Sequence, residues 1–128
     1  MKFTIPIQPI TKKNHQEIVN VRGRPMLLQS KKYRDYEKKA VLFVPKLYLT
    51  GPVTVKALFY MQARRRVDLI NLLEALDDVL VCGGLLVDDN CLSIPSHDGS
   101  RVFYDKINPR TEVEVYDYMG AMPWEESR

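Results

Sequence analysis

The chain of 128 residues has no long apolar run and only two cysteines. No segment approaches the roughly 18 consecutive apolar residues that are needed to cross a bilayer. Residues 1–10 alternate and end in prolines, and they lack the roughly 7 to 15 apolar residues of a secretory signal. We therefore expect a soluble, cytoplasmic protein with no membrane partner and with reduced thiols. Cys82, which follows Val81, is expected to be a small core residue, and Cys91 has no metal-binding spacing to it.

Motifs for covalent catalysis and for organic cofactors are also absent. The sequence contains no Gly-rich phosphate loop and no Ser or Cys nucleophile motif. His15 and His97 have no partner at the spacing of a metal site or a catalytic triad, so both are expected to be ordinary exposed or packed histidines. We therefore predict no small-molecule cofactor.

Charge is the first positive feature of the chain. The 19 basic and 16 acidic side chains give a formal charge of only +3, but the first 66 residues hold 15 basic and 3 acidic side chains. The other 62 hold 4 basic and 13 acidic ones. The apolar content of 45% is enough for a core, and the length suits one domain. The sequence thus predicts one folded domain with a basic and an acidic half.

The basic half shows a strand, a loop, a helix and a second strand. Residues 2–7 alternate as a strand does, and residues 10–28 form a long basic loop with a short hairpin around 21–26. Ser30 can cap a helix that continues until Pro45 stops it. Residues 53–61 are rich in Val, Leu, Phe and Tyr and predict a strand.

The acidic half opens with the clearest helix of the chain. Leu69, Leu72, Leu76 and Leu80 belong to one apolar stripe, which starts after an N-cap at Asp68 and ends at the glycines 83–84. Strands are expected over residues 91–96 and 111–118. We predict an α/β (α+β) single domain over residues 1–118, with a mixed sheet of about four strands and two main helices. Residues 119–128 are expected to form a C-terminal tail.

Arginines and carboxylates meet where the two halves join. Arg64, Arg65 and Arg66 precede Asp68, and the pair Asp88 and Asp89 follows about twenty residues later. Arginines bind phosphates, and carboxylates bind the Mg²⁺ that polarises a phosphate and lowers the pKa of an attacking water. The combination suits chemistry on DNA. The alternative is that Asp68 only caps its helix while the other carboxylates, including Asp77 and Asp78, are merely solvated.

At these residues the chain resembles the RusA family of Holliday junction resolvases. The family pattern has a basic run, then Asp-Leu-x-Asn-Leu on an amphipathic helix, then Gly-x-x-x-Asp-Asp. Here it stands as residues 64–66, 68–72 and 84–89. The opening strand with its Lys-Lys-Asn loop, the Gly23-Arg24 step and the Ser-x-x-Tyr start of the first helix are similar as well. The resemblance covers residues 2 to about 118.

The resemblance implies a Mg²⁺-dependent endonuclease, in which Mn²⁺ could substitute, that resolves four-way DNA junctions by paired nicks. Asp68 and Asp89 match the family's metal-binding aspartates, with Asp88 beside them as a further catalytic candidate. Many members carry a second aspartate where this chain has Ile70, which cannot bind a metal. Glu74, at a position where some members carry a lysine, could replace that ligand, with Asn71 and Asp78 supporting it from the same helix face.

The candidate DNA contacts lie in the basic half. Phosphate binding is expected from Lys12, Lys13, Arg22 and Arg24 in the loop and from Arg64, Arg65 and Arg66, among which Arg64 and Arg66 should share a face of an extended segment. Asn14 matches the family's loop asparagine and either touches DNA or holds the loop.

The expected partners are branched DNA and a second copy of the chain. A four-way junction has approximate two-fold symmetry, so two identical sites in a homodimer can make the paired cuts. Three alternatives stay open: a junction-binding module with weak or no cleavage because of Ile70, a nuclease for other branched DNA or RNA, and a small regulatory domain that binds no nucleic acid.

Overall fold

The core of the protein is a four-stranded mixed sheet. The structure, a computed structural model, describes residues 1–12, 16–29 and 31–125. The strands stand in the order β1-β6-β4-β5, and only the β4–β5 pair is parallel. Their bounds are Lys2–Ile5 for β1, Val53–Met61 for β4, Arg101–Tyr104 for β5 and Arg110–Asp117 for β6. The predicted mixed sheet and α+β class are confirmed.

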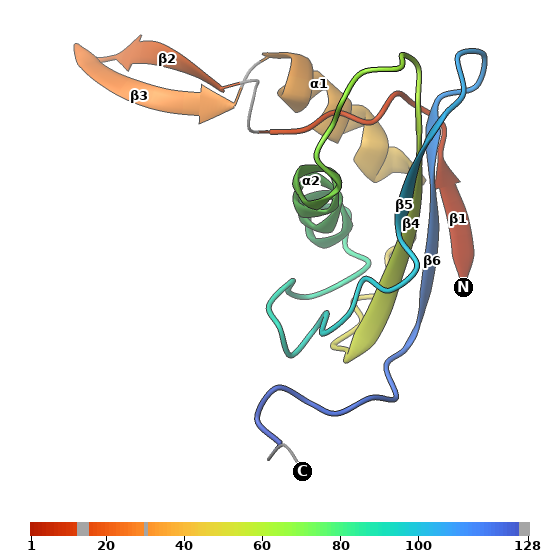
Figure 1. Ribbon diagram of the computed structural model, residues 1–128. Helices are drawn as coiled ribbons and strands as arrows, with labels where there is room; N and C mark the ends of the chain where they lie inside the picture. The colour runs from red at the N-terminus through yellow and green to blue at the C-terminus, as the bar shows by residue number, and fades with distance from the viewer. Residues whose placement is uncertain (13–15, 30, 126–128) are drawn as a thin grey trace.

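Two helices cover one face of this sheet (Figure 1). Helix α1 spans Lys31–Ala40 and continues as a 3-10 turn over Val41–Phe43, and α2 spans Leu69–Cys82. The inward side chains of β4, from Val53 to Phe59, are at most 4% exposed. They pack with Tyr33 and Tyr36 of α1 and with the leucines of α2 into one core. Among the described residues, no helix is long and apolar enough to span a membrane.

Helix α2 begins and ends as its sequence predicts. Asp68 caps it, because its Oδ1 accepts a hydrogen bond from the Ile70 N–H at 2.8 Å. At the other end, Gly83 donates its N–H to the carbonyl of Val79 at 2.8 Å. Gly84 follows with a φ of 83°, which an L side chain rarely adopts. Both ends of α2 are therefore determined by local residues.

A two-stranded hairpin projects away from the body of the protein (Figure 1). Strands β2, Gln16–Val21, and β3, Arg24–Gln29, pair antiparallel around a two-residue turn. Arg22 and Gly23 in this turn both have positive φ, 54° and 78°, which matches the twist of a two-residue hairpin. The predicted hairpin is confirmed and is longer than the sequence indicated. The predicted cap Ser30 lies outside the described residues.

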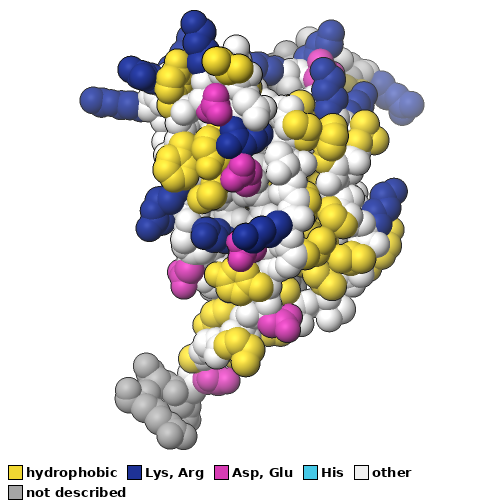
Figure 2. Space-filling view, turned by 90° about the vertical axis from the view of Figure 1, so that its right-hand side faces the viewer, with side chains coloured by type: hydrophobic (Ala, Val, Ile, Leu, Met, Phe, Trp, Pro, Cys, Tyr) yellow, Lys and Arg dark blue, Asp and Glu magenta, His cyan; other side chains and the backbone are white. Residues whose placement is uncertain are grey.

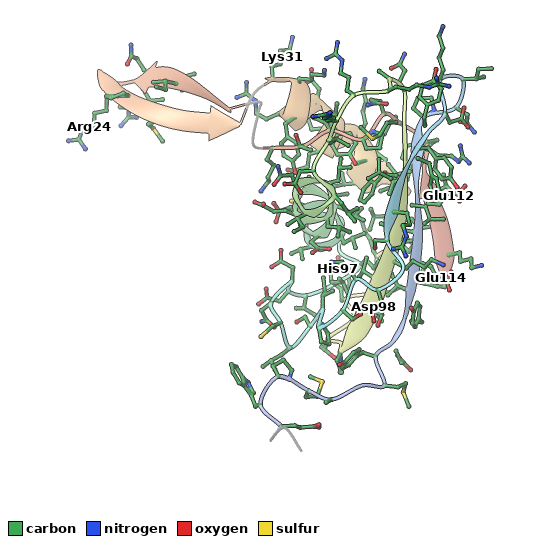
Figure 3. All side chains as sticks on the ribbon, viewed as in Figure 1. Arg24, Lys31, His97, Asp98, Glu112 and Glu114 are labelled. Carbon is green, nitrogen blue, oxygen red and sulfur yellow. The ribbon has the colours of Figure 1, made fainter. Side chains whose placement is uncertain are left out.

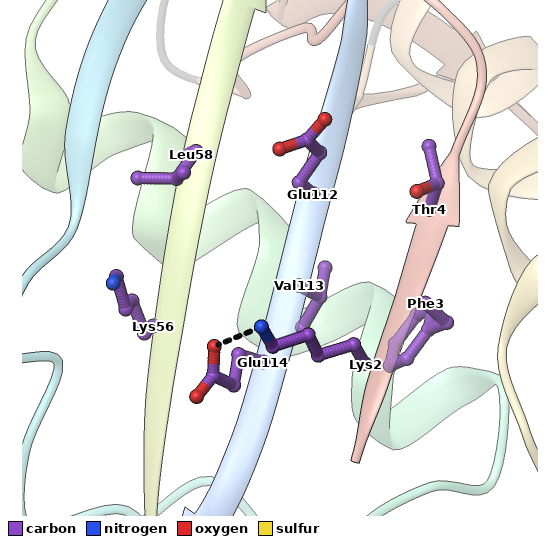
Figure 4. A pocket seen from close by; sticks show the side chains of 8 residues that line it. All are labelled: Lys2, Phe3, Thr4, Lys56, Leu58, Glu112, Val113 and Glu114. Atoms are coloured by element: carbon purple, nitrogen blue, oxygen red, sulfur yellow. Dashed lines mark ion pairs between the residues drawn. The ribbon is translucent and has the colours of Figure 1, made fainter.

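The other face of the sheet is open to solvent. Figure 2 looks onto this face, where charged side chains of both signs alternate with hydrophobic ones. A shallow hollow crosses β1, β6 and β4 (Figure 4). Among its lining residues, Lys2 Nζ lies 3.6 Å from Glu114 Oε2. Arg110 lies over the ring of Tyr60 at 3.8 Å, and Tyr60 stacks on Phe103. This face carries side chains of both charges and lies on the side of the sheet opposite to the helices.

The predicted strand over residues 91–96 is wrong. The Asn90 side chain accepts hydrogen bonds from the N–H groups of Leu92 and Ser93, which makes a turn there, and Pro95 has no N–H to donate. Only the carbonyls of Ser93 and Ser96 bond to β4, at 2.9 and 3.1 Å. The strand that pairs with β4 on the side opposite to β6 is β5, which is four residues long and was missed by the sequence analysis.

The core position predicted for Cys82 is also wrong. The residue is exposed at the end of α2, and its Sγ lies 3.8 Å from Glu37 Oε1. The apolar stripe of α2 passes through Val79 and Leu80, and residue 82 falls on the far side of the last turn. The C-terminal tail over residues 119–128 stays a prediction, with the exposed Trp124 among its described residues.

The packing of α2 predicts a large loss of stability when its leucine stripe is truncated. Leu76 is 1% exposed, so Leu76→Ala should lower the free energy of unfolding by about 2–5 kcal/mol. Ile70, on the same helix, is 72% exposed, and Ile70→Ala should change it by less than about 0.5 kcal/mol. Urea denaturation of both variants checks this, and equal losses would contradict the assigned core face.

Asp105 predicts an acid-dependent loss of stability. The backbone N–H of Asn108, then Arg110 and the N–H of Ile107, hold the pKa of Asp105 below its ordinary 3.8. A lowered pKa gives stability that is present above pH 3.8 and is lost as the pH falls through the lowered value. Asp105→Asn should therefore be less stable than the parent at neutral pH and approach it in strong acid. Urea midpoints at several pH values measure this, and a constant difference would disprove it.

Candidate functional site

Helix α2 presents two polar stripes to two different loops. At about 100° per residue, Ile70, Glu74 and Asp77 share one stripe, and Asn71 and Asp78 share another about 100° away. The apolar stripe that packs on the sheet determines where both of them face. The expectation that Asn71, Glu74 and Asp78 act on one face is therefore corrected, because Asn71 and Glu74 line different hollows.

The stripe that begins at Asn71 borders a basic groove at the start of α2. Two adjoining hollows share Thr11, Arg66 and Val67, and we call them together the arginine groove. Asp68 and Asn71 line one end, and Arg65 and Lys32 line the other. The loop that follows β1 forms one wall, and Gln8 Oε1 accepts a hydrogen bond from the Gln62 N–H at 2.7 Å to hold it there. Lys32, Thr11 and Gln8 were not among the predicted site residues.

The side chains of the three arginines do not alternate between two faces as they would in an extended strand. Arg65 and Arg66 line the arginine groove, whereas the guanidinium of Arg64 lies 4.6 Å from the ring centre of Tyr104 at the end of β5. Residues 64–68 follow the end of β4 without belonging to a strand, so side chains do not alternate strictly there. The expected shared face of Arg64 and Arg66 is therefore corrected to Arg65 and Arg66.

The stripe of Ile70, Glu74 and Asp77 borders an acidic hollow, which we call the Asp89 hollow. It has a volume of about 420 Å³ and lies between α2 and the loop that leads to β5. Its lining residues are Ile70, Leu73, Glu74, Asp77, Asp89 and His97. The structure thus brings two predicted metal ligands, Glu74 and Asp89, to one hollow, while Asp68 stays in the neighbouring groove.

The electrostatics of the Asp89 hollow favour a cation. Burial, followed by the nearby carboxylates of Asp78 and Asp88, raises the pKa of Asp89 above its ordinary value. Asp88 Oδ1 accepts the Asp89 N–H at 2.7 Å and its Oδ2 accepts from Asn90 Nδ2 at 3.2 Å, so Asp88 shapes the turn that carries Asp89. A positive charge near Asp89 would relieve this crowding.

The structure gives His97 a partner that the sequence did not reveal. Its Nε2 lies 3.0 and 2.9 Å from the two carboxylate oxygens of Asp77, which is only 8% exposed. Burial raises the pKa of Asp77, and the hydrogen bond from His97 opposes that shift. The two residues are 20 positions apart, and no local pattern links them. The sequence spacing did not predict this partner of His97.

Lys12 and Asp78 form an ion pair between the first loop and α2. The Lys12 ammonium contacts Asp78 Oδ2 and lies 5.8 Å from the ring centre of Tyr33. The amphipathic lysine thereby holds the loop against the helices. A direct role of Asp78 as a metal ligand competes with this pair.

The remaining predicted DNA contacts lie on or near the hairpin. Arg22 and Arg24 are exposed at its tip, the end farthest from the body of the protein, and Figure 3 labels Arg24 there. Lys13 and Asn14 lie outside the described residues. The structure thus supplies basic side chains at two places, the hairpin tip and the arginine groove.

The donor set fits a hard divalent cation that takes only part of its ligands from protein. In the described part of the chain, no three His, Cys, Asp or Glu side chains form a group that could hold a metal ion by themselves. Mg²⁺, however, is usually bound through one or two carboxylates together with waters and substrate phosphates. Glu74 and Asp89 in one hollow meet that requirement.

Comparison with known proteins assigns the family. No curated protein matches the sequence. The family model described as Endodeoxyribonuclease RusA matches residues 6–116, which is most of the chain and includes both α2 and the Asp89 hollow. RusA proteins are endonucleases that resolve Holliday junctions, generally with a divalent metal, and the sequence resemblance is thereby confirmed. The chain belongs to the RusA endodeoxyribonuclease family.

Proposed function

We propose that the protein is a Mg²⁺-dependent endonuclease that resolves four-way DNA junctions by paired, symmetric nicks. The observation that carries the proposal is the position of the arginine groove next to the Asp89 hollow, on adjacent stripes of α2. A groove that binds phosphate beside carboxylates that bind a cation is the arrangement that phosphodiester hydrolysis needs.

DNA binding is assigned to the basic side chains on both sides of α2. Arg65, Arg66 and Lys32 line a groove with no acidic side chain except Asp68 at its end, so a phosphate backbone fits along it. Arg22 and Arg24, which are exposed at the hairpin tip, are assigned to a second arm of the branched DNA. Lys12 contributes by holding the loop, through Asp78, rather than through a free ammonium.

Glu74 and Asp89 are the proposed metal ligands in the Asp89 hollow, with Asp68 added from the family pattern. Mg²⁺, or Mn²⁺ in its place, polarises the phosphate and activates water when it is bound there. Glu74 thereby takes the place of the aspartate that many family members carry at position 70. Asn71 supports Asp68 from the same end of α2.

The paired nicks are assigned to a homodimer. A four-way junction has approximate two-fold symmetry, and two copies related by a two-fold axis present two identical sites to opposed strands. Two independent single cuts would leave a nicked junction between them. A dimer avoids that intermediate by keeping both sites on one substrate.

A second candidate function is junction binding with weak or no cleavage. Ile70 is 72% exposed and lines the Asp89 hollow, so an apolar side chain stands where many relatives carry a ligand. A protein of this kind would hold branched DNA through the arginine groove without cutting it. Incubation of the parent with a synthetic four-way junction and Mg²⁺ distinguishes the two functions.

Substitution of the proposed ligands should separate cutting from binding. Asp89→Asn and Asp68→Asn are each expected to bind the junction as the parent does but to lose at least about 100-fold in nicking rate, because the metal loses a charged ligand. The exposed Asp117→Asn is the matched control and should cut at the parent rate. Nicking at the parent rate by either variant would remove that residue from the site.

Loss of Arg66 should weaken DNA binding in a salt-dependent way. Arg66→Ala removes one phosphate contact, so the slope of log K against log salt should fall by about one unit. The control is Lys46, an exposed lysine in the segment that precedes β4. Lys46→Ala should leave the slope unchanged. Gel-shift titrations at several salt concentrations measure both. An unchanged slope for Arg66→Ala would contradict the assigned groove.

A further inference from the structure

His97 is held in one orientation from both its ring and its backbone. A carboxylate only accepts hydrogen bonds, so the contacts of 3.0 and 2.9 Å to Asp77 assign the proton of a neutral ring to Nε2. The His97 carbonyl accepts the Ser100 N–H at 3.2 Å, and the preceding Ser96 carbonyl accepts the Val55 N–H of β4 at 3.1 Å. Hydrogen bonds therefore hold the loop against the sheet and the ring of His97 against α2.

The proton on Nε2 leaves a lone pair on Nδ1. No hydrogen bond to Nδ1 occurs within the described residues. The charged groups that share the hollow are Glu74 and Asp77 from α2 and Asp89 from the loop, while Asp78 and Asp88 act on Asp89 from its margins. Asp98 next to His97 is exposed, and Lys56 of β4 packs against Gly99. Among the described residues that line the hollow, His97 alone offers a nitrogen base.

We propose that His97 is the general base of the nuclease reaction and that Asp77 is its positioning residue. The inference rests on the proposed function, because it assigns a role within the same hydrolysis. No three His, Cys, Asp or Glu side chains of the described residues form a group that could hold a metal ion. A cation on Glu74 and Asp89 therefore leaves the imidazole of His97 available to a water or a phosphate within the hollow of about 420 Å³. An Asp that fixes the tautomer of a His is the arrangement that makes the second ring nitrogen a proton acceptor.

The step balances without any further reagent. A water in the Asp89 hollow forms a bond from its oxygen to the phosphorus while one of its protons passes to His97 Nδ1. The bond from phosphorus to the bridging 3′ oxygen breaks, and that oxygen takes a proton from solvent. The products are a 3′ hydroxyl and a 5′ phosphate, and Nδ1 returns its proton to solvent before the next turnover.

The first test compares His97→Gln with Asp98→Asn in cleavage of a four-way junction with Mg²⁺. His97→Gln should lose about 10²- to 10⁴-fold in the rate of a single turnover, the contribution of a general base, with unchanged junction affinity. Asp77→Asn should lose part of that rate. Asp98→Asn, an exposed neighbour that loses the same charge as Asp77→Asn, should cut at the parent rate. A His97→Gln variant that cuts as fast as the parent overturns the inference.

Chemical rescue separates a base from a structural clamp. Added imidazoles should restore cutting by His97→Gly in proportion to their concentration, and the restored rate should rise with the basicity of the imidazole. A rescue that is independent of basicity, or the absence of rescue in a folded variant, overturns the role as base. In the parent, nitrogen NMR should find the neutral ring protonated at Nε2, and a proton on Nδ1 instead would overturn it even if the variants fail to fold.

Cleavage by the parent protein distinguishes a failure of the proposed nuclease function from a failure of the proposed role of His97. A parent that binds the junction but leaves its strands intact with both Mg²⁺ and Mn²⁺ contradicts the proposed nuclease function. A parent that cuts while His97→Gln cuts equally well contradicts the role of His97 alone.

Discussion

The burial of the leucine stripe of α2 against β4 determines the orientation of the proposed site. Leu72, Leu76, Val79 and Leu80 are at most 1% exposed, and a helix rotated by one residue would move all of them by about 100°. This packing leaves two polar stripes, of which one faces the arginine groove and the other faces the Asp89 hollow. The hydrophobic effect thus positions charged groups that could not position themselves, because like carboxylates repel.

The loop between α2 and β5 completes the site through its backbone. Its path is determined by hydrogen bonds to segments distant in sequence, among them those from Tyr48 and Leu49 to Gly84 and Leu85 and those from β4 to Ser93 and Ser96. Asp89 lies between these anchor points, and His97 directly follows the last of them, Ser96. The loop forms no strand of its own, because individual hydrogen bonds to these segments hold it in place.

Opposite charges meet across the helices instead of spreading evenly. The net +3 of the chain conceals a basic half and an acidic half, which contact each other where Lys12 pairs with Asp78. Burial, followed by the carboxylates of Asp78 and Asp88, raises the pKa of Asp89, and it is there that a divalent cation is proposed. The raised pKa of Asp89 thus reflects its burial first and then the carboxylates that the fold holds close to it.

Local residues by themselves determined α2 with its caps Asp68 and Gly83, α1, β4 and the hairpin, because periodicity, capping and turn preferences act over a few neighbours. The motifs around Asp68 and Asp89 also determined the family. Only the tertiary structure decided that β5 rather than residues 91–96 pairs with β4, that Arg65 and not Arg64 lines the groove, and that His97 meets Asp77. Each of these depends on the path of an irregular loop over a packed core, and such paths are selected by long-range hydrogen bonds and burial that no local sequence pattern records.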